Sequence, residues 1–195
     1  LDDGTIKLDK YIGDVLSDGF VIPEEYNGKP ITVLGSRFIT LDKIYGLWYD
    51  EFTITIPDSV TTIEEEALYF DLSDVNNFSL PYITEIHVGK NVKSIARKGI
   101  LAKGFDDWES TLEQFEDSED YRKNKTKITV DPDNEWFTVY DDGLYTKDLS
   151  EVVWYHPLTR EVNMPENVRV IRSGAFYALD FIESLYIPNG VTELE

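Results

Sequence analysis

The sequence predicts a β-rich solenoid of short parallel strands, interrupted by an inserted helix and a β-hairpin. Three observations support this prediction. One set of apolar positions recurs along the chain, two neighbouring copies of it lie 23 residues apart (Pro165 and Pro188), and two segments depart from the pattern. Because a recurring unit defines a whole architecture, the repeat is the first feature to establish.

Each copy of the repeat is aligned on the residue that ends its first strand and is named after that residue: Pro57, Gly89, Pro165 or Pro188. Apolar or small residues recur three and one positions before it, and three, six, ten and eleven positions after it. The Pro57 copy has Ile54, Ile56, Val60, Ile63, Ala67 and Leu68, and the Pro165 copy has Val162, Met164, Val168, Ile171, Ala175 and Phe176. An earlier copy at Pro23 fits once five residues are inserted in its turn, and residues 128–130 match the strand. We expect about five to six copies.

The spacing of these positions predicts the local structure of one copy. The two apolar residues before the aligning residue alternate, so they share one face of a strand. Proline then ends the strand because it lacks the N–H that a ladder needs. Asp58-Ser59 and Glu166-Asn167 favour a turn, after which a second short strand points its apolar residues inward again. One copy buries too little apolar surface to fold alone, so the copies must stack.

Several segments lie outside the repeat. Residues 1–18 are expected to cap the first copy, and residues 19–195 to form the solenoid. A helical insertion is predicted over about 102–127, because four large apolar residues form one stripe: Phe105, Trp108, Leu112 and Phe115. A hairpin insertion is predicted over about 131–157, with its turn at Asp141-Asp142-Gly143. The chain stops inside a copy, so we expect it to be truncated at its C-terminal end.

The repeat segments resemble a known family. They are Ile-Thr-Ile-Pro-Asp-Ser-Val-Thr-Thr-Ile (54–63), Val-Arg-Val-Ile-Arg-Ser-Gly-Ala-Phe (168–176), Tyr-Ile-Pro-Asn-Gly-Val-Thr-Glu-Leu (186–194) and residues 19–35, and they are similar to BspA-like, or Treponema-type, leucine-rich repeats. The resemblance implies the right-handed α/β-superhelix class and an exported or surface protein that acts in adhesion and protein recognition. It supplies no catalytic residues. Ala67-Leu68 and Gly99-Ile100 depart from the usual Ala-Phe pair, and the common corner cysteine is absent.

Composition narrows the classes of function. The chain has 18 basic and 38 acidic residues and a net charge of −20, which disfavours nucleic acid and anionic lipid as partners. The absence of cysteine excludes disulfides, thiol catalysis and cysteine-based zinc sites. No apolar run approaches the roughly 20 residues of a membrane span. The two histidines, His87 and His156, have no spacing typical of metal ligands, so no metal or cofactor is predicted.

We therefore expect a non-catalytic, secreted or cell-surface module that binds a protein partner, such as a host or matrix protein. The candidate contacts face outward two positions before each aligning residue, and they are Val21, Thr55, His87, Thr129, Asn163 and Tyr186. A carbohydrate-binding module is the alternative, with Trp48, Tyr49, Trp154 and Tyr155 as stacking platforms, although packing against the solenoid is the favoured interpretation for Trp48 and Tyr49. A structural spacer of a larger surface protein is a further alternative. A carboxylate-dependent hydrolase has little support, because acidic pairs are common in so acidic a chain.

Overall fold

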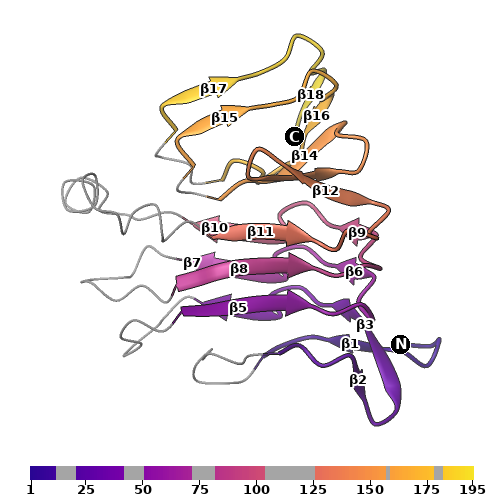
Figure 1. The fold of residues 1–195 in the computed structure, drawn as a ribbon. Helices are drawn as coiled ribbons and strands as arrows, with labels where there is room; N and C mark the ends of the chain where they lie inside the picture. Colours follow the sequence, from indigo (N-terminus) through magenta and orange to yellow (C-terminus); the bar gives the residue numbers. More distant parts are fainter. Residues whose placement is uncertain (12–20, 42–50, 72–81, 104–125, 157–158, 178–181) are drawn as a thin grey trace.

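The computed structural model describes residues 1–11, 21–41, 51–71, 82–103, 126–156, 159–177 and 182–195 (Figure 1). Within these ranges the chain is rich in strands, most of its strand pairs are parallel, and no helix occurs. It follows that the described residues hold no helix that could cross a membrane. This arrangement is consistent with a repeat-protein fold.

The first strand of each copy lies on one side of the stack. β5 (Glu51–Ile56), β8 (Tyr82–Val88) and β11 (Lys127–Val130) form a three-stranded parallel sheet in which β8 is central. β15 (Glu161–Asn163) and β17 (Ser184–Tyr186) form a separate parallel pair further along the stack (Figure 1). Each of these five copies therefore adds one strand to this side, whereas the described residues of the Pro23 copy form no strand there.

The second strands lie beside one another in the same order. β3 (Lys29–Leu34), β6 (Thr62–Ile63) and β9 (Ser94–Ile95) pair in parallel, and β1 (Ile6–Leu8) pairs with β3 on the N-terminal side. β2 (Glu25–Tyr26) folds back antiparallel onto β3. β1 thus lies on the edge of the first copy.

A third ladder and a larger sheet complete the fold. β4 (Ile39–Leu41), β7 (Leu68–Asp71) and β10 (Ile100–Lys103) form a parallel sheet in which β7 is central. The second half contains a five-stranded sheet in the order β12-β13-β14-β16-β18. Its strands are β12 (Phe137–Tyr140), β13 (Gly143–Thr146), β14 (Glu151–Trp154), β16 (Val170–Ile171) and β18 (Glu193–Leu194).

The apolar positions found in the sequence form the core. All six of the Pro57 copy have no exposed surface, and those of the Gly89 copy are also buried. Five copies also close the same turn, in which the residue at position three donates its N–H to the carbonyl of the aligning residue. In the Pro57 copy Val60 makes this bond at 3.0 Å, and the equivalent pairs are Val92–Gly89, Asn134–Asp131, Val168–Pro165 and Val191–Pro188. Asp131 therefore aligns a further copy, whose strand is β11.

The corners of the copies stack through a second recurring feature. One residue in each corner adopts a left-handed conformation, namely Arg37, Glu66, Lys98 or Gly174, with φ between 54° and 80°. The N–H of Arg37 donates to the carbonyl of Glu66 at 3.0 Å, that of Glu66 to Lys98 at 2.9 Å, and that of Lys98 to Ser173 at 3.2 Å. The corner of the Gly89 copy therefore meets that of the Pro165 copy directly, and the Asp131 copy contributes no corner.

Some expectations differ from the structure or lie outside it. Most of the predicted helical insertion, 104–125, lies outside the described residues, and at its ends Ala102 and Lys103 belong to β10 while Lys127 belongs to β11. In the Pro188 copy, apolar residues expected in the core are exposed, with 40% of Leu185, 45% of Ile187 and 71% of Leu194 accessible. The reason is that β17 and β18 have a neighbouring strand on one edge only within the described chain.

The predicted hairpin is present as β12 and β13. Its two-residue loop is Asp141 and Asp142, both with positive φ (44° and 63°), which matches the twist that tight hairpins need. Gly143 pairs with Tyr140 and is outside the loop. It leaves room for the ring of Tyr155, because a Cβ at this position would lie 2.4 Å from Cζ of Tyr155. The hydroxyls of Tyr145 and Tyr155 hydrogen-bond at 2.5 Å inside the core, and burial raises the pKa of Tyr145 to about 12 and also raises the pKa of Tyr155.

The inward and outward positions of β5 can be tested on adjacent residues. Ile54 is fully buried whereas Thr55 is exposed, so Ile54→Ala should lower the free energy of unfolding by about 2–5 kcal/mol and Thr55→Ala by less than about 0.5 kcal/mol. Urea denaturation of both variants measures the difference. Equal effects would show that the register of β5 is wrong.

The buried tyrosine pair predicts a non-additive result. Tyr145→Phe leaves the Tyr155 hydroxyl buried without its partner and should cost about 1–3 kcal/mol of stability, whereas replacing both tyrosines with phenylalanine should be nearly neutral. A double-mutant cycle measured by urea denaturation tests this. Additive losses would contradict the hydrogen bond.

The same pair predicts a loss of stability at alkaline pH. A raised pKa means that the folded state keeps the phenolic protons which the unfolded chain releases above a pKa of 10.0. The contribution to stability is therefore complete below about pH 10 and falls as pH rises through about 12. The double phenylalanine variant should show a shallower decline in the free energy of unfolding between about pH 10 and pH 12. An unchanged slope would indicate that these hydroxyls are not buried.

Candidate functional site

The sheet of β5, β8 and β11 presents two rows of side chains on its outer face. Strand register aligns the predicted residue His87 with Thr55 on one side and Thr129 on the other. Two positions earlier, Glu85 is aligned with Thr53 and Lys127. The residues between these rows point inward and are buried: Ile54, Ile86 and Ile128. The alternation of a pleated strand therefore separates a polar outer face from the core.

Hydrogen bonds connect three side chains on this face. The Thr129 hydroxyl donates to Oε1 of Glu85 at 2.5 Å, and Nδ1 of His87 lies 2.9 Å from the same hydroxyl. Since the threonine proton is directed to the carboxylate, Nδ1 of His87 acts as the donor to the hydroxyl oxygen. The three side chains are partly buried, and the bonds hold them in one arrangement across β8 and β11.

The order of this chain of bonds bears on its chemistry. A nucleophilic hydroxyl is activated when a histidine accepts its proton and a carboxylate orients that histidine. Here Thr129 stands in the middle instead, donating to Glu85 and accepting from His87. The imidazole is therefore not placed as a base for this hydroxyl. Within the described ranges there is also no group of three histidine, aspartate or glutamate side chains suited to hold a metal ion.

The remaining members of the predicted row are not continuous with this face. Asn163 and Tyr186 are aligned with each other on β15 and β17, but the hairpin separates them from β11. The carboxylate of Asp141, in the hairpin turn, accepts the backbone N–H of Asn163 at 3.2 Å. Val21 is 68% exposed and lies outside any strand. The structure thus brings together Thr55, His87 and Thr129 and places the others apart.

The aromatic residues considered for glycan binding have different outcomes. Trp154 and Tyr155 are 2% and 1% exposed, so the prediction that they form stacking platforms is wrong. Tyr155 is stacked on Phe176, and Trp154 packs edge-on against the ring of His156. Trp154 ends β14, which is central in its sheet, and Tyr155 follows it directly, so both side chains enter the core. Trp48 and Tyr49 lie outside the described residues.

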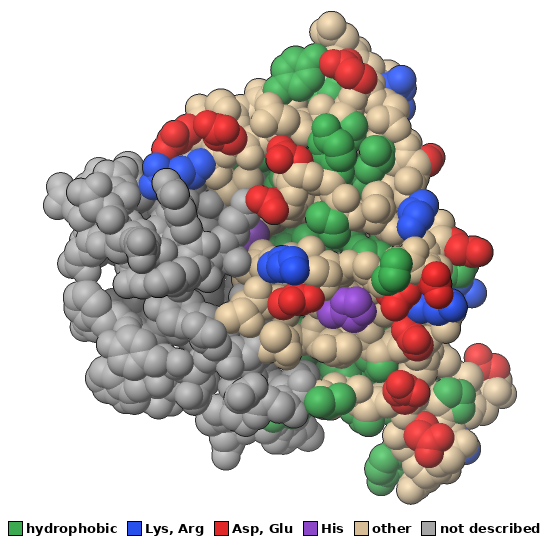
Figure 2. All heavy atoms as spheres, in the orientation of Figure 1, with side chains coloured by type: hydrophobic (Ala, Val, Ile, Leu, Met, Phe, Trp, Pro, Cys, Tyr) green, Lys and Arg blue, Asp and Glu red, His purple; other side chains and the backbone are tan. Residues whose placement is uncertain are grey.

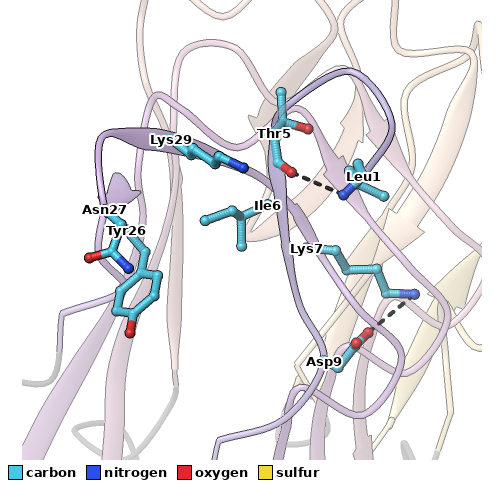
Figure 3. A pocket seen from close by; sticks show the side chains of 8 residues that line it. All are labelled: Leu1, Thr5, Ile6, Lys7, Asp9, Tyr26, Asn27 and Lys29. Atoms are coloured by element: carbon cyan, nitrogen blue, oxygen red, sulfur yellow. Dashed lines mark hydrogen bonds and ion pairs between the residues drawn. The ribbon is translucent and has the colours of Figure 1, made fainter.

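An open depression lies at the N-terminal end of the stack. Its volume is about 530 Å³, and Figure 3 shows Tyr26, Asn27 and Lys29 on one side and the segment from Leu1 to Asp9 on the other. Lys7 is paired with Asp9 at 3.4 Å and with Glu64 at 2.8 Å. The exposed phenol of Tyr26 lies across the depression from this pair.

A second depression lies beside β11 and was not predicted from the sequence. This groove has a volume of about 360 Å³ and runs between β11 and the hairpin strand β12, and Lys127, Thr129, Val139 and Lys147 are among the residues that line it. Its contributors Lys127 and Thr129 belong to the two outer rows. The position of Lys127 could have been found from the sequence, because residues two apart on a strand share a face.

The charge of the outer surface is uneven. Figure 2 shows acidic side chains spread over this view of the molecule, with a few basic side chains and a histidine between them. Several basic residues join one copy to the next, including Lys90 to Asp133 at 3.1 Å and Arg172 to Glu151 at 2.6 Å. The hydrogen bond to Asp133 raises the pKa of Lys90. Acidic residues outnumber basic ones by 38 to 18 in the sequence, so the net charge stays at −20.

Comparison with known proteins gives two similar structures. No family model matches the sequence, and no curated protein matches it. A leucine-rich repeat protein from Eubacterium ventriosum is 15% identical with a TM-score of 0.43, and the alignment covers 100% of this chain and 58% of that one. The pneumococcal vaccine antigen PcpA is 14% identical with a TM-score of 0.33, covering 98% of this chain and 60% of that one. The chain thus spans less than two thirds of each protein, and its structural neighbours include a bacterial leucine-rich repeat protein.

Proposed function

We propose that this chain is a non-catalytic, leucine-rich-repeat-type solenoid module of a secreted or cell-surface protein, and that it binds a protein partner through the outer face of β5, β8 and β11. The observation that carries the proposal is the aligned row of Thr55, His87 and Thr129 on adjacent parallel strands. Repeat arrays use such rows as extended binding surfaces. The resemblance of the repeat segments to BspA-like repeats supports the same role and location.

The fixed side chains favour recognition by this face. Binding costs about 0.5–1.5 kcal/mol for each flexible side chain that becomes immobilised. The bonds from Thr129 to Glu85 and His87 already hold these groups, so less freedom is lost when a partner arrives. The buried isoleucines behind the face and the pairing on both edges of β8 keep its backbone in place.

The chemistry of the face indicates the kind of partner. Its outer positions are short or polar, and they include one carboxylate, one ammonium and one imidazole: Thr53, Thr55, Glu85, His87, Lys127 and Thr129. Such a surface suits a polar protein surface better than an apolar ligand. The acidic surroundings add an attraction for basic partners, which raises the rate of association at low salt.

The role of the face is tested with a partner identified among purified extracellular-matrix proteins. Thr55→Arg should weaken binding at least about tenfold, because a long side chain at this exposed position would separate the two surfaces. Surface plasmon resonance measures the affinity, and thermal melting checks that the fold is retained.

The matched control is Ser94→Arg, which makes a comparable change at an exposed residue of β9, in a different sheet. Its affinity should equal that of the unmodified chain. Retention of full affinity by Thr55→Arg, or an equal loss in Ser94→Arg, would place the contact surface elsewhere.

A further inference from the structure

The groove beside β11 exposes the edge of a strand. β11 pairs with β8 on one side only, and β12, on the other side, belongs to a different sheet. Asp131 donates its N–H to the Val88 carbonyl at 2.9 Å. The N–H and C=O of Asp131 therefore face β8. Because these groups alternate along a strand, the N–H and C=O of Ile128 and Val130 point away from β8. No backbone bond among the described residues joins them to another strand.

The hairpin is the reason that this edge is free. In the preceding layers each first strand meets the next at strand spacing, as β5 meets β8 and β8 meets β11. After β11 the chain enters β12, and parallel pairing resumes only between β15 and β17. Asp141 caps the N–H of Asn163 on the far side of the gap. The ladder therefore has an interruption, and the groove of about 360 Å³ lies at it.

The lining of the groove has a charge opposite to that of the chain. It includes two lysines, Lys127 and Lys147, and a single carboxylate, Asp131. The ammonium of Lys147 donates a 2.7 Å hydrogen bond to the carbonyl of Asn134. The turn from Asp131 to Asn134 therefore fixes the position of this ammonium. In a chain of net charge −20, this is a local site for a carboxylate.

We propose that the groove binds an extended peptide segment of a protein partner, which adds to the edge of β11 as a further strand and carries acidic side chains. Main-chain bonds to Ile128 and Val130 would give affinity, as in other cases of strand addition. Alternate side chains would give specificity, since those on the outer side lie beside Lys127 and Lys147 and those on the inner side lie toward Val130. The preferred segment therefore alternates acidic and small apolar residues.

The test uses the blocked peptide acetyl-Glu-Val-Glu-Val-Glu-Val-amide and the full chain. Titration followed by ¹H–¹⁵N NMR should shift the amide signals of Ile128 and Val130 downfield as new hydrogen bonds form. The double variant Lys127→Glu/Lys147→Glu should bind at least about tenfold more weakly, because two attractive charges become repulsive. Peptide N-methylated at alternate amides should lose binding because it cannot complete the ladder.

The controls separate this site from the outer face and from general charge effects. Lys93→Glu reverses one exposed charge elsewhere, and Thr55→Arg disrupts the outer face, so both should bind the peptide normally. Binding that survives N-methylation, or that leaves the Ile128 and Val130 amides unmoved, would overturn the proposal. So would concentration-dependent dimerisation abolished by Lys127→Glu/Lys147→Glu, because a second copy of the chain would then be the occupant. If Thr55→Arg loses binding to the matrix protein but still binds the peptide, the result supports the proposed function of the outer face and leaves the groove as a separate site.

Discussion

Backbone hydrogen bonding between successive copies is the constraint on which the whole structure depends. A copy consists of strands only two to seven residues long, and none of them buries a core by itself. Most strands pair with the same strand of a neighbouring copy, and the turn from position zero to position three recurs with N···O distances of 2.9–3.4 Å. The apolar positions must repeat because each one lies on the equivalent residue of its neighbour. The outer face follows from the same strand pairing, because every second side chain of a paired strand points away from the core.

The Asp131 copy shows how an exception to the rule creates a distinctive site. Asn134 occupies the position that holds valine in neighbouring copies, and it is 1% exposed. Its amide donates to the carbonyls of Gly89 and Val92, and its oxygen accepts the N–H groups of Trp136 and Phe137. A buried polar group is tolerated because all these bonds are made. The bonds to Trp136 and Phe137 lie at the point where β12 begins, so this residue helps to direct the chain out of the repeat and into the hairpin.

Much of this could be predicted from the sequence, and the limits have physical causes. The apolar offsets identified the core because burial depends on periodicity, and Asp141-Asp142 identified the hairpin turn because its φ angles require particular residues. The purpose of Gly143 could not be found in this way, since it depends on the ring of Tyr155 reaching it from another strand. The outer row was predicted as continuous, yet the hairpin divides it between Thr129 and Asn163. Similarly, the burial of Trp154 and Tyr155 could not be predicted from the sequence. It depends on β14 having a strand on each side, and the sequence does not show which strands pair with it.

The corner contacts have a mechanical consequence. Arg37, Glu66, Lys98 and Ser173 form an unbroken column of backbone bonds, whereas the column of first strands is interrupted between β11 and β15. Fewer backbone hydrogen bonds resist bending where the first strands are interrupted. The corner bonds on the other side of the stack remain continuous there, so they keep neighbouring copies together. The molecule has a built-in direction of bending, with the interruption as the side that opens. We expect the protein under shear to open first at this interruption, while the corner bonds keep its two halves joined.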